Sequence, residues 1–250
     1  MLAARCDDLS RAVERLKLID FHDALILLRS SFSAPKIQHL LRCSPCVGHK
    51  SLETYDDILK IGISLITNTE LSESQWLQAS LPVKDGGLGV RRATSLALPS
   101  FLASASSTSV LQSQILESSN CVADSSIEKA YRELWSNLYD TPALDTPLSF
   151  KQGAWDHPYL LSAKATLLES AAGDAYNSAR LAAVTAPHSG DWLHALPISS
   201  CGLKLDNEAI RVAVGLHLGV DLCISHKCPC GLLVDTKGSH SLSCKLACHF

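Results

Sequence analysis

The sequence opens on a periodic stretch, Asp7-Asp-Leu-Ser-Arg-Ala-Val-Glu-Arg-Leu-Lys-Leu-Ile-Asp-Phe-His-Asp-Ala-Leu-Ile-Leu-Leu-Arg29. Its apolar positions recur mostly every three or four residues, with charged residues between them, and they are Leu9, Val13, Leu16, Ile19, Leu25 and Leu28. This spacing places the apolar side chains on one face of a helix. We therefore expect one amphipathic helix from Asp7 to Arg29.

The helical pattern continues beyond this stretch. Pro35 ends the first helix, because proline is tolerated at a helix start but not in a helix interior. A second, short helix is predicted through Ile37, Leu40 and Leu41. A third is predicted from a further apolar series at Leu52, Tyr55, Leu59, Ile63 and Ile66.

The rest of the chain also favours helices. Asp85-Gly86-Gly87 predicts a chain reversal within 81–92, flanked by short strands or extended segments. Helices are predicted over 93–118, 124–139 and 158–184, with Ser-rich or Pro-containing joints at 104–109, 118–126 and 141–158. One more is predicted from Asn207 to Leu218. The fold class is therefore expected to be mainly α.

Composition and charge narrow the function classes. The 250 residues are 46% hydrophobic, enough for one large domain or two smaller ones, and only 6% aromatic, which disfavours an autonomous single-strand binder that stacks bases. The formal net charge of -3 lacks the broad positive field of a free-standing nucleic-acid binder. Residues 1–50 carry eight Lys and Arg against five Asp and Glu, a net charge of +3, and the remaining 14 basic and 20 acidic residues leave -6.

Targeting signals are not evident in the sequence. The start lacks the apolar core of a signal peptide, and no apolar run approaches the roughly 20 residues needed to span a bilayer. We expect an intracellular chain with no membrane partner, without distinguishing nucleus from cytoplasm. Its ten cysteines are then expected to be reduced thiols or metal ligands and not disulfides.

The strongest chemical signal lies near the C-terminus. Cys228-Pro-Cys230-Gly231 is followed by His240 and, after three more residues, by Cys244. Thiolate and imidazole ligands in two close pairs suit tetrahedral zinc, which would hold together a loop with little core of its own. The alternative is a set of unrelated reduced cysteines with a surface histidine. Substitute ligands, if one assignment is wrong, are Cys223, His226, Cys248 and His249.

Two other patterns suggest enzymes and are interpreted differently. Asp56-Asp57 resembles the paired aspartates of a polymerase, but the surrounding apolar positions are helical, whereas that magnesium site needs a tight turn between strands. We expect both side chains on the solvated side of a helix, near its N-terminal end. Cys43-Ser-Pro-Cys46 has redox spacing, yet it follows a helical pattern where a thioredoxin-like pair should follow a strand.

The glycine-rich stretch at 86–89 and the arginine pair at 91–92 are weak signals of phosphate binding. Gly86-Gly87-Leu88-Gly89 lacks the Lys-Ser/Thr of a phosphate loop, so a turn is the better interpretation. Arg91-Arg92 could reach a phosphate backbone, although two arginines are more often solvated surface.

Three stretches carry a family resemblance. The first is Leu25-Ile-Leu-Leu-Arg-Ser-Ser-Phe-Ser-Ala-Pro-Lys36 with Leu41-Arg-Cys-Ser-Pro-Cys46, and the most specific is Trp76-Leu-Gln-Ala-Ser-Leu-Pro-Val-Lys-Asp-Gly-Gly-Leu-Gly-Val-Arg-Arg-Ala93, continuing to Ser104. The third runs from Ser189-Gly-Asp-Trp-Leu-His-Ala-Leu-Pro197 through Arg211-Val-Ala-Val-Gly-Leu-His-Leu-Gly219 to the Cys/His motif. Together they resemble the C-terminal part of reverse transcriptases from non-long-terminal-repeat retrotransposons.

This resemblance implies an organisation and an ancestral role. It implies a thumb-like helical region over 1–110, a helical connector over 111–188 and a truncated Cys/His region over 189–250. The fingers and palm, with their magnesium-binding aspartates, would lie before residue 1, and no nuclease follows. The chain would thus be no enzyme by itself, but a region of an RNA-directed DNA polymerase that contacts template and primer, with a palm-bearing polymerase chain as a possible partner.

The expected site residues follow. The candidate zinc ligands are Cys228, Cys230, His240 and Cys244, and the candidate phosphate contacts are Lys36, Arg42, Arg91 and Arg92. Two alternatives stay open: a domesticated zinc-dependent module that binds nucleic acid or protein, and a non-functional relic that folds poorly without its polymerase neighbour.

Overall fold

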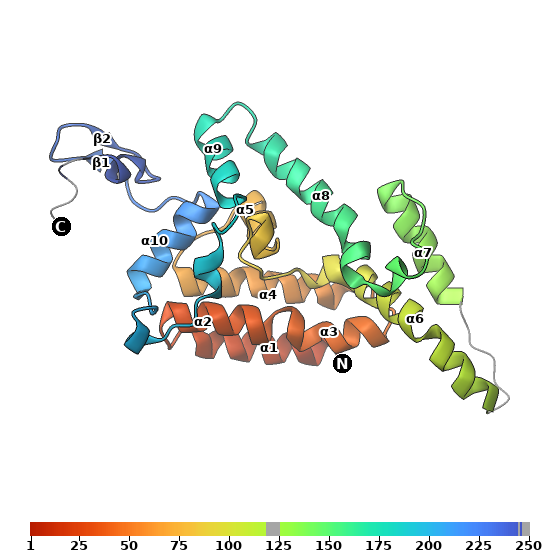
Figure 1. The fold of residues 1–250 in the computed structure, drawn as a ribbon. Coiled ribbons are helices and arrows are strands. Elements are labelled where there is room, and N and C mark those ends of the chain that lie inside the picture. The colour runs from red at the N-terminus through yellow and green to blue at the C-terminus, as the bar shows by residue number, and fades with distance from the viewer. Residues whose placement is uncertain (119–125, 245, 247–250) are drawn as a thin grey trace. The chain divides into compact units, whose positions relative to one another are not determined.

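The computed structural model describes residues 1–118, 126–244 and 246, and this part of the chain is mainly α, as the sequence predicts (Figure 1). Its α-helices are Leu2–Leu16 (α1), Phe21–Leu27 (α2), Ala34–Cys43 (α3), Lys50–Thr67 (α4), Glu73–Ala79 (α5), Ala93–Ser118 (α6), Ser126–Tyr139 (α7), Gln152–Ser170 (α8), Ala175–Val184 (α9) and Asn207–Leu218 (α10). Two short strands, His226–Lys227 (β1) and Leu233–Val234 (β2), pair in antiparallel fashion. Of the helices described, none combines the length and apolar character that a membrane crossing requires.

The chain forms two compact units, and neither is one continuous stretch. The first unit comprises residues 1–12, 29–59 and 91–166, and the second comprises 13–28, 60–90 and 167–250. Helices α1, α4 and α8 therefore each contribute residues to both units. The division at residues 110 and 188 rests on the family resemblance and stays a prediction.

The first unit is built on the pairing of α3 with α6 and on a tryptophan cluster. Trp135 of α7 and Trp155 of α8 are both buried and pack edge to face, with ring centroids 4.9 Å apart. Trp135 Nε1 donates to the Trp155 carbonyl at 2.9 Å, and Trp155 Nε1 donates to the Ser149 carbonyl at 2.8 Å. Both indole N–H groups are thus satisfied inside the core, as burial of a polar group requires.

In the second unit, α10 packs against α2 and α5 (Figure 1). The N-terminal end of α10 is tied to α2, because Asn207 Oδ1 accepts the Phe21 N–H at 2.8 Å and His22 Nδ1 accepts the Leu205 N–H at 3.1 Å. Its C-terminal end closes on Gly219, which adopts the left-handed φ of 69°. These bonds fix the helix from which the Cys/His motif extends.

Several predicted helices are confirmed. The five apolar residues that predict the third helix lie in α4 with exposed fractions of 1% or less. The predicted helix from Asn207 to Leu218 is α10, with the same bounds. Pro35 lies in the first turn of α3, as the sequence analysis expects of a proline at a helix start.

The single helix predicted from Asp7 to Arg29 is wrong, because the chain breaks between α1 and α2. Leu18 is 79% exposed and Ile19 is 41% exposed, so the apolar face ends at Leu16. The start of α2 is held separately, since Lys204 Nζ contacts Asp20 at 2.6 Å and Asp23 at 2.9 Å. The six-residue step from Ile19 to Leu25 marks this break in the sequence.

The predicted Ser-rich joint at 104–109 is also wrong, because α6 runs through it. Hydroxyl groups of Ser107 and Thr108 donate to the Ser104 carbonyl, and Ser109 donates to the Ser106 carbonyl. Such bonds to a preceding turn let these residues stay helical. The predicted 158–184 helix is divided at residues 171–174 into α8 and α9, and α8 begins earlier than predicted, at Gln152. Most of the predicted 118–126 joint lies outside the described residues.

The chain reversal predicted within 81–92 is confirmed, but the flanking strands do not form in this described segment. A 3-10 turn at Val83–Asp85 (η2) leads to Gly86, whose φ is 81°. Gly87 follows so closely that a Cβ there would lie 2.1 Å from the Leu81 carbonyl oxygen. The carbonyls of Ala79 and Leu81 accept the N–H groups of Leu88 and Gly89, and these bonds close the reversal without a regular strand in this segment.

Candidate metal centre

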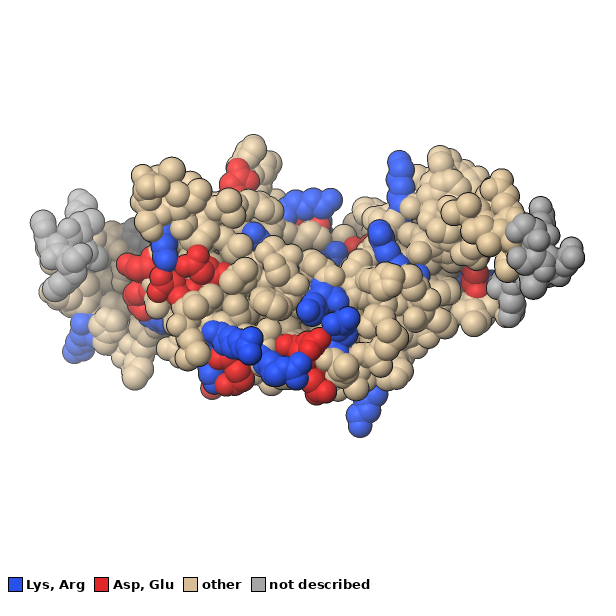
Figure 2. All heavy atoms as spheres, turned by 90° about the horizontal axis from the view of Figure 1, so that it is seen from below, with Lys and Arg blue, Asp and Glu red and all other residues tan. Residues whose placement is uncertain are grey.

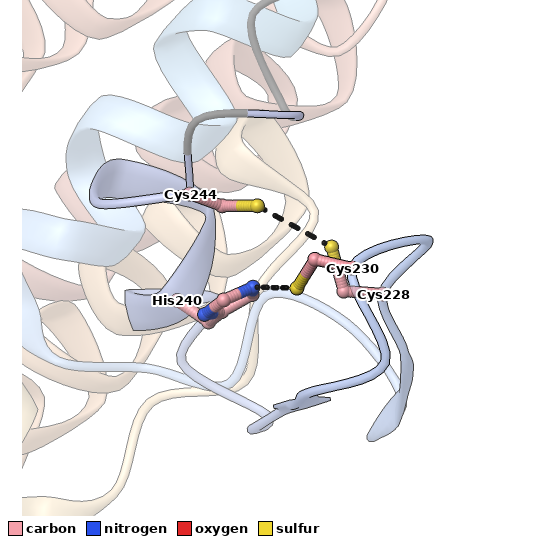
Figure 3. A group of neighbouring side chains, drawn as sticks. All are labelled: Cys228, Cys230, His240 and Cys244. Atoms are coloured by element: carbon pink, nitrogen blue, oxygen red, sulfur yellow. Dashed lines mark hydrogen bonds between the residues drawn. The ribbon is translucent and has the colours of Figure 1, made fainter.

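The structure brings the four predicted ligands together at one point of the second unit. The ligand atoms of Cys228, Cys230, His240 and Cys244 all lie within 4.8 Å of one another, so the group could hold a metal ion. Figure 3 shows the four side chains pointing toward a common centre, with Cys228 Sγ 3.6 Å from Cys244 Sγ and Cys230 Sγ 3.1 Å from His240 Nε2. Cys244 is 8% exposed, whereas Cys230 is open to solvent.

The first ligand pair sits on the turn between β1 and β2. Residues His226 and Lys227 pair with Val234 and Leu233, and the Cys228 N–H donates to the Leu232 carbonyl at 2.9 Å. The Gly231 N–H donates back to the Cys228 carbonyl at 2.8 Å. Gly231 has a φ of 91°, which a residue with a side chain adopts only with strain, so the turn behind the first ligand pair requires glycine at this position.

The second pair sits on a 3-10 turn, Ser239–Leu242 (η6). Gly238 precedes this turn with a left-handed φ of 70° and begins it by accepting the Ser241 N–H. The Cys244 N–H donates to the His240 carbonyl at 3.0 Å. Each half of the site is thus placed by local backbone bonds, and the ligand atoms of the two halves lie beside one another.

The apolar core around the site is very small. Val234 is the only buried aliphatic residue in the cluster formed by the described residues, and its buried companions are the ligands Cys228 and Cys244. Cys223 packs against this cluster from the side. So little apolar burial supplies little folding free energy, and a bound metal would have to supply much of the rest.

The close spacing of the thiols also favours a bound metal ion on electrostatic grounds. The Cys230 N–H lowers the pKa of Cys228, but desolvation and hydrogen bonds with the Cys230 and Cys244 thiols outweigh it, and the pKa lies above its ordinary value. Adjacent thiolates repel one another unless a cation lies between them. The arrangement is therefore suited to a metal ion and unsuited to three free thiolates.

The proposed substitute ligands are placed elsewhere. Cys223 Sγ donates to the Asp235 carbonyl at 3.3 Å, and His226 Nδ1 lies 2.9 Å from the Ile224 carbonyl, so neither joins the group of four. Cys248 and His249 lie outside the described residues.

The Cys/His unit, residues 220–244, is fastened to the end of α10. The Leu222 N–H donates to the Thr236 carbonyl at 2.8 Å, and Arg211 of α10 donates to the Leu222 carbonyl at 2.9 Å. Lys237 Nζ reaches the Gly219 carbonyl and Asp221 Oδ1, both at 2.7 Å. The metal centre is thus linked directly to a helix of the second unit.

The four candidate phosphate contacts differ in their surroundings. Lys36 and Arg42 are exposed at the two ends of α3. Arg91 forms a two-bond ion pair with Asp156, with both N–O distances at 2.8 Å and exposed side-chain fractions of 15% and 7%. Arg92 is half-buried, and its charge opposes the burial that raises the pKa of Asp56. A phosphate at Arg91 would have to compete with Asp156, whereas one at Lys36 or Arg42 would not.

Charges on the surface are interspersed. On the face drawn in Figure 2, Lys and Arg side chains lie among Asp and Glu side chains and uncharged surface, with no broad field of one sign. The basic residues Arg5 and Arg11 of α1 and Lys17 just after it illustrate this, because their ion pairs are Arg5–Asp8, Arg11–Asp8 and Lys17–Glu14. These pairs intersperse the two signs of charge but leave the net charge of +3 over residues 1–50 unchanged.

The prediction that Asp56 lies on the solvated side of its helix is wrong. Asp56 is 6% exposed and accepts the Ala93 N–H at 2.5 Å, the Thr94 N–H at 3.2 Å and the Thr94 hydroxyl at 2.5 Å. It caps the start of α6 from a different helix. Burial raises the pKa of Asp56, although the bonds from Thr94 and Ala93 oppose that shift. Asp57 is exposed, as predicted.

The Cys43 and Cys46 pair has no reactive environment. Cys43 is exposed at the end of α3, with its Sγ 3.7 Å from His39 Nδ1. Cys46 is 6% exposed, and burial raises the pKa of its thiol. A redox-active pair requires a lowered thiol pKa, so these surroundings favour a structural role.

Sequence reasoning missed a buried polar cluster in the second unit. His217 of α10 is 5% exposed, and its Nε2 lies 3.0 Å from the Gly86 carbonyl. Gln78 Nε2 donates to the carbonyls of Gly86 and His217 at 3.0 Å, and Arg180 donates to the His217 carbonyl at 2.6 Å. His217 and Gly86 are 131 positions apart, and Arg180 and Gln78 are 102 positions apart. No local spacing in the sequence could therefore have revealed the cluster.

Lowering the pH is expected to destabilise the chain through His217. Burial lowers the pKa of His217, and the Arg180 charge acts in the same direction. The unfolded chain therefore takes up the proton first, so stability is retained above the ordinary histidine pKa of about 6.5 and falls as the pH drops from there toward the folded value.

Urea unfolding of wild type and His217→Gln between about pH 7.5 and 5.5 measures this effect. Glutamine keeps a donor for the Gly86 carbonyl but cannot take up a proton. Any stability that acid removes by releasing a metal from the Cys/His site is lost equally by wild type and variant. The variant should therefore lose less stability than wild type on acidification, and parallel profiles would contradict the assignment to His217.

Comparison with known proteins does not assign the site. No protein-family model, curated protein or solved structure matches the chain. The resemblance to reverse transcriptases thus rests on the three quoted stretches and stays a prediction. The case for a function rests on the metal centre and the side chains around it.

Proposed function

We propose that the Cys/His unit of the chain is a zinc-stapled module that contacts single-stranded nucleic acid, and that the chain descends from the region after the polymerase active site of a non-long-terminal-repeat retrotransposon reverse transcriptase. The low aromatic content and the net charge of -3 disfavour a broad binding surface over the whole chain, so the proposed contact is confined to this unit. The convergence of four soft and imidazole ligands in a unit with almost no apolar core carries this proposal. A tetrahedral zinc site with Zn–S bonds of about 2.3 Å has ligand-to-ligand distances near 3.8 Å. The 3.6 Å separation of Cys228 Sγ and Cys244 Sγ is close to that value.

Side chains beside the metal centre support nucleic acid as the ligand. His226 and Lys227 are exposed on β1, and Ile224, Leu232 and Leu233 are exposed large hydrophobic residues on the same hairpin. Lys227 lies directly opposite Leu233, so these two side chains share one face. Cations attract phosphates, and an exposed imidazole such as that of His226 offers a ring on which an unstacked base can stack.

The proposal includes no polymerase activity for this chain. Neighbouring residues on a helix point about 100° apart, so Asp56 and Asp57 of α4 cannot aim their carboxylates at a common pair of metal ions. Asp56 is moreover occupied by the three donors at the start of α6. A palm-bearing chain as partner remains part of the proposal only through the resemblance.

Lys227→Gln is expected to weaken binding of a single-stranded RNA oligomer by about three- to tenfold at low salt. It should also reduce the slope of log K against log salt by about one, because one phosphate contact is lost. Fluorescence anisotropy of the zinc-loaded full chain measures both quantities. Lys129→Gln on α7 is the matched control, because Lys129 is also exposed but lies in the first unit. Equal affinities and slopes for wild type and Lys227→Gln would contradict the proposed contact.

A protein partner is the second candidate, and the exposed apolar group of Ile224, Leu232 and Leu233 favours it. Apolar surface of this kind often marks a protein interface. Leu233→Ser distinguishes the two candidates. If RNA binding is undetectable in wild type while wild type captures a defined protein and Leu233→Ser does not, the protein candidate replaces the nucleic-acid proposal.

A further inference from the structure

A polar cavity in the second unit lies apart from the metal ligands. Its volume is about 180 Å³, and its walls come from α5, α8, α9, the end of α10 and the turn after β2. The polar lining residues are Ser74, Gln75, Gln78, Ser170, Asn177, Arg180 and Lys237, and no Asp or Glu is part of the lining. Two cations thus face a cavity that contains no carboxylate of its own.

Arg180 is the unusual member of this lining. Its recorded bonds run from Nε to Asn177 Oδ1 at 3.1 Å and from Nη1 to Gln78 Oε1 at 2.8 Å and the His217 carbonyl at 2.6 Å. All three acceptors are uncharged. Among the described residues, the Nη2 N–H groups have no acceptor. Desolvation lowers the pKa of Arg180, which shows that the protein stabilises this charge incompletely.

Lys237 brings the second charge from the Cys/His unit. Two of its three N–H groups are used by the Gly219 carbonyl and Asp221, both at 2.7 Å. The Asp221 carboxylate is 66% exposed and lies outside the lining. Asp174, whose charge also attracts Arg180, is the exposed N-cap of α9 and is bonded to Asn177. Solvent screens both acids more strongly than it screens the guanidinium inside the cavity.

We propose that this cavity binds a tetrahedral oxyanion of the phosphate type between Arg180 and Lys237. A guanidinium binds phosphate through paired N–H groups, and the Nη2 groups of Arg180 are the donors still to be used. Ser74, Gln75 and Asn177 also lie on the walls, with side chains already bonded to Ser72, Gly219 and Asp174, so Arg180 and Lys237 carry the proposed contact. The cavity exceeds the roughly 30 Å³ that one water molecule occupies several times over, so an oxyanion fits.

Such a site would connect two parts of the second unit. Arg180 belongs to α9, whereas Lys237 lies between β2 and the ligand His240. An oxyanion held by both would add a charged link between α9 and the Cys/His unit. The inference does not depend on the proposed function, because inorganic phosphate could bind even if nucleic acid does not.

Isothermal titration of the zinc-loaded full chain with inorganic phosphate at constant ionic strength tests the site. We expect saturable binding of one phosphate per chain, weakened about tenfold by Arg180→Gln and about threefold or more by Lys237→Gln. Arg180 also holds the His217 carbonyl, and its variant could fail to fold. Lys237→Gln keeps the test valid, because Gln75 Nε2 still donates to the Gly219 carbonyl.

Lys129→Gln is the matched control, since it removes one exposed lysine of α7 that lies outside the cavity and has no proposed binding role, and its phosphate affinity should equal that of wild type. A second titration, with single-stranded RNA, separates the sources of the oxyanion. Loss of both phosphate and RNA affinity in Lys237→Gln assigns a strand phosphate to the cavity, and loss of phosphate affinity alone assigns a free anion. Absence of saturable phosphate binding to wild type, or equal binding by wild type and Lys237→Gln, would overturn the proposal.

Discussion

Replacing Cys228 and Cys230 together by serine is expected to abolish zinc binding and to unfold the Cys/His unit, while the helices stay folded. Serine hydroxyls are poor zinc ligands, and the two remaining ligands cannot hold the ion alone. Structural zinc supplies apparent free energies of about 10–16 kcal/mol in small zinc modules. Val234 is the single buried aliphatic residue in the described cluster around the ligands, so apolar burial cannot replace that contribution.

Two readouts on the purified full chain test this expectation. Zinc content should fall from about one ion per chain to none, and amide hydrogens of residues 226–244 should lose their protection from exchange. Cys43→Ser/Cys46→Ser is the matched control, since it removes two thiols at the end of α3. That control should keep its zinc. A Cys228→Ser/Cys230→Ser chain that retains zinc, or retains amide protection without it, would show that the four residues do not form a metal centre.

Asp56→Ala is expected to destabilise the chain by about 3 kcal/mol, whereas Asp57→Ala should change its stability by less than about 0.5 kcal/mol. The alanine leaves the N–H groups of Ala93 and Thr94 without their buried acceptor at the first turn of α6. Asp57 is exposed one position later on the same helix. The two substitutions are therefore nearly identical in chemistry and different only in environment.

Urea denaturation followed by circular dichroism measures both free energies of unfolding. Asp56→Asn provides a check on charge, because the amide oxygen still accepts a hydrogen bond, and a smaller loss than for alanine is expected. Equal and small effects at positions 56 and 57 would restore the original interpretation, in which both carboxylates lie on a solvated helix face.

The sequence predicted those parts of the fold that local pattern controls. Five apolar residues at helical spacing identified α4, and all five are buried in it. Asp206 and Gly219 bound α10 with capping residues of the expected types. The four candidate metal ligands converge because Gly231 and Gly238 shape the two turns that carry them, which is also local information.

The parts that failed depend on distant contacts. Asp56 is buried because α6, which begins 37 residues later, needs an acceptor at its first turn. That Arg91 contacts a phosphate stays a prediction, but its ion pair with Asp156, which lies 65 residues away, could not be inferred from any local spacing. The Ser-rich segment of α6 failed for a different reason: serine is a poor helix former on average, yet its hydroxyl can bond to the preceding turn.

The most direct measurement is RNA binding by the metal-free full chain with and without one equivalent of zinc, at the same salt concentration. The account predicts that binding of a single-stranded oligomer appears on zinc addition and weakens steadily as salt is raised, because zinc folds the surface that carries Lys227 and Leu233. RNA binding of equal strength in the metal-free chain, or no RNA binding by the zinc-loaded chain, would contradict a zinc-built nucleic-acid module.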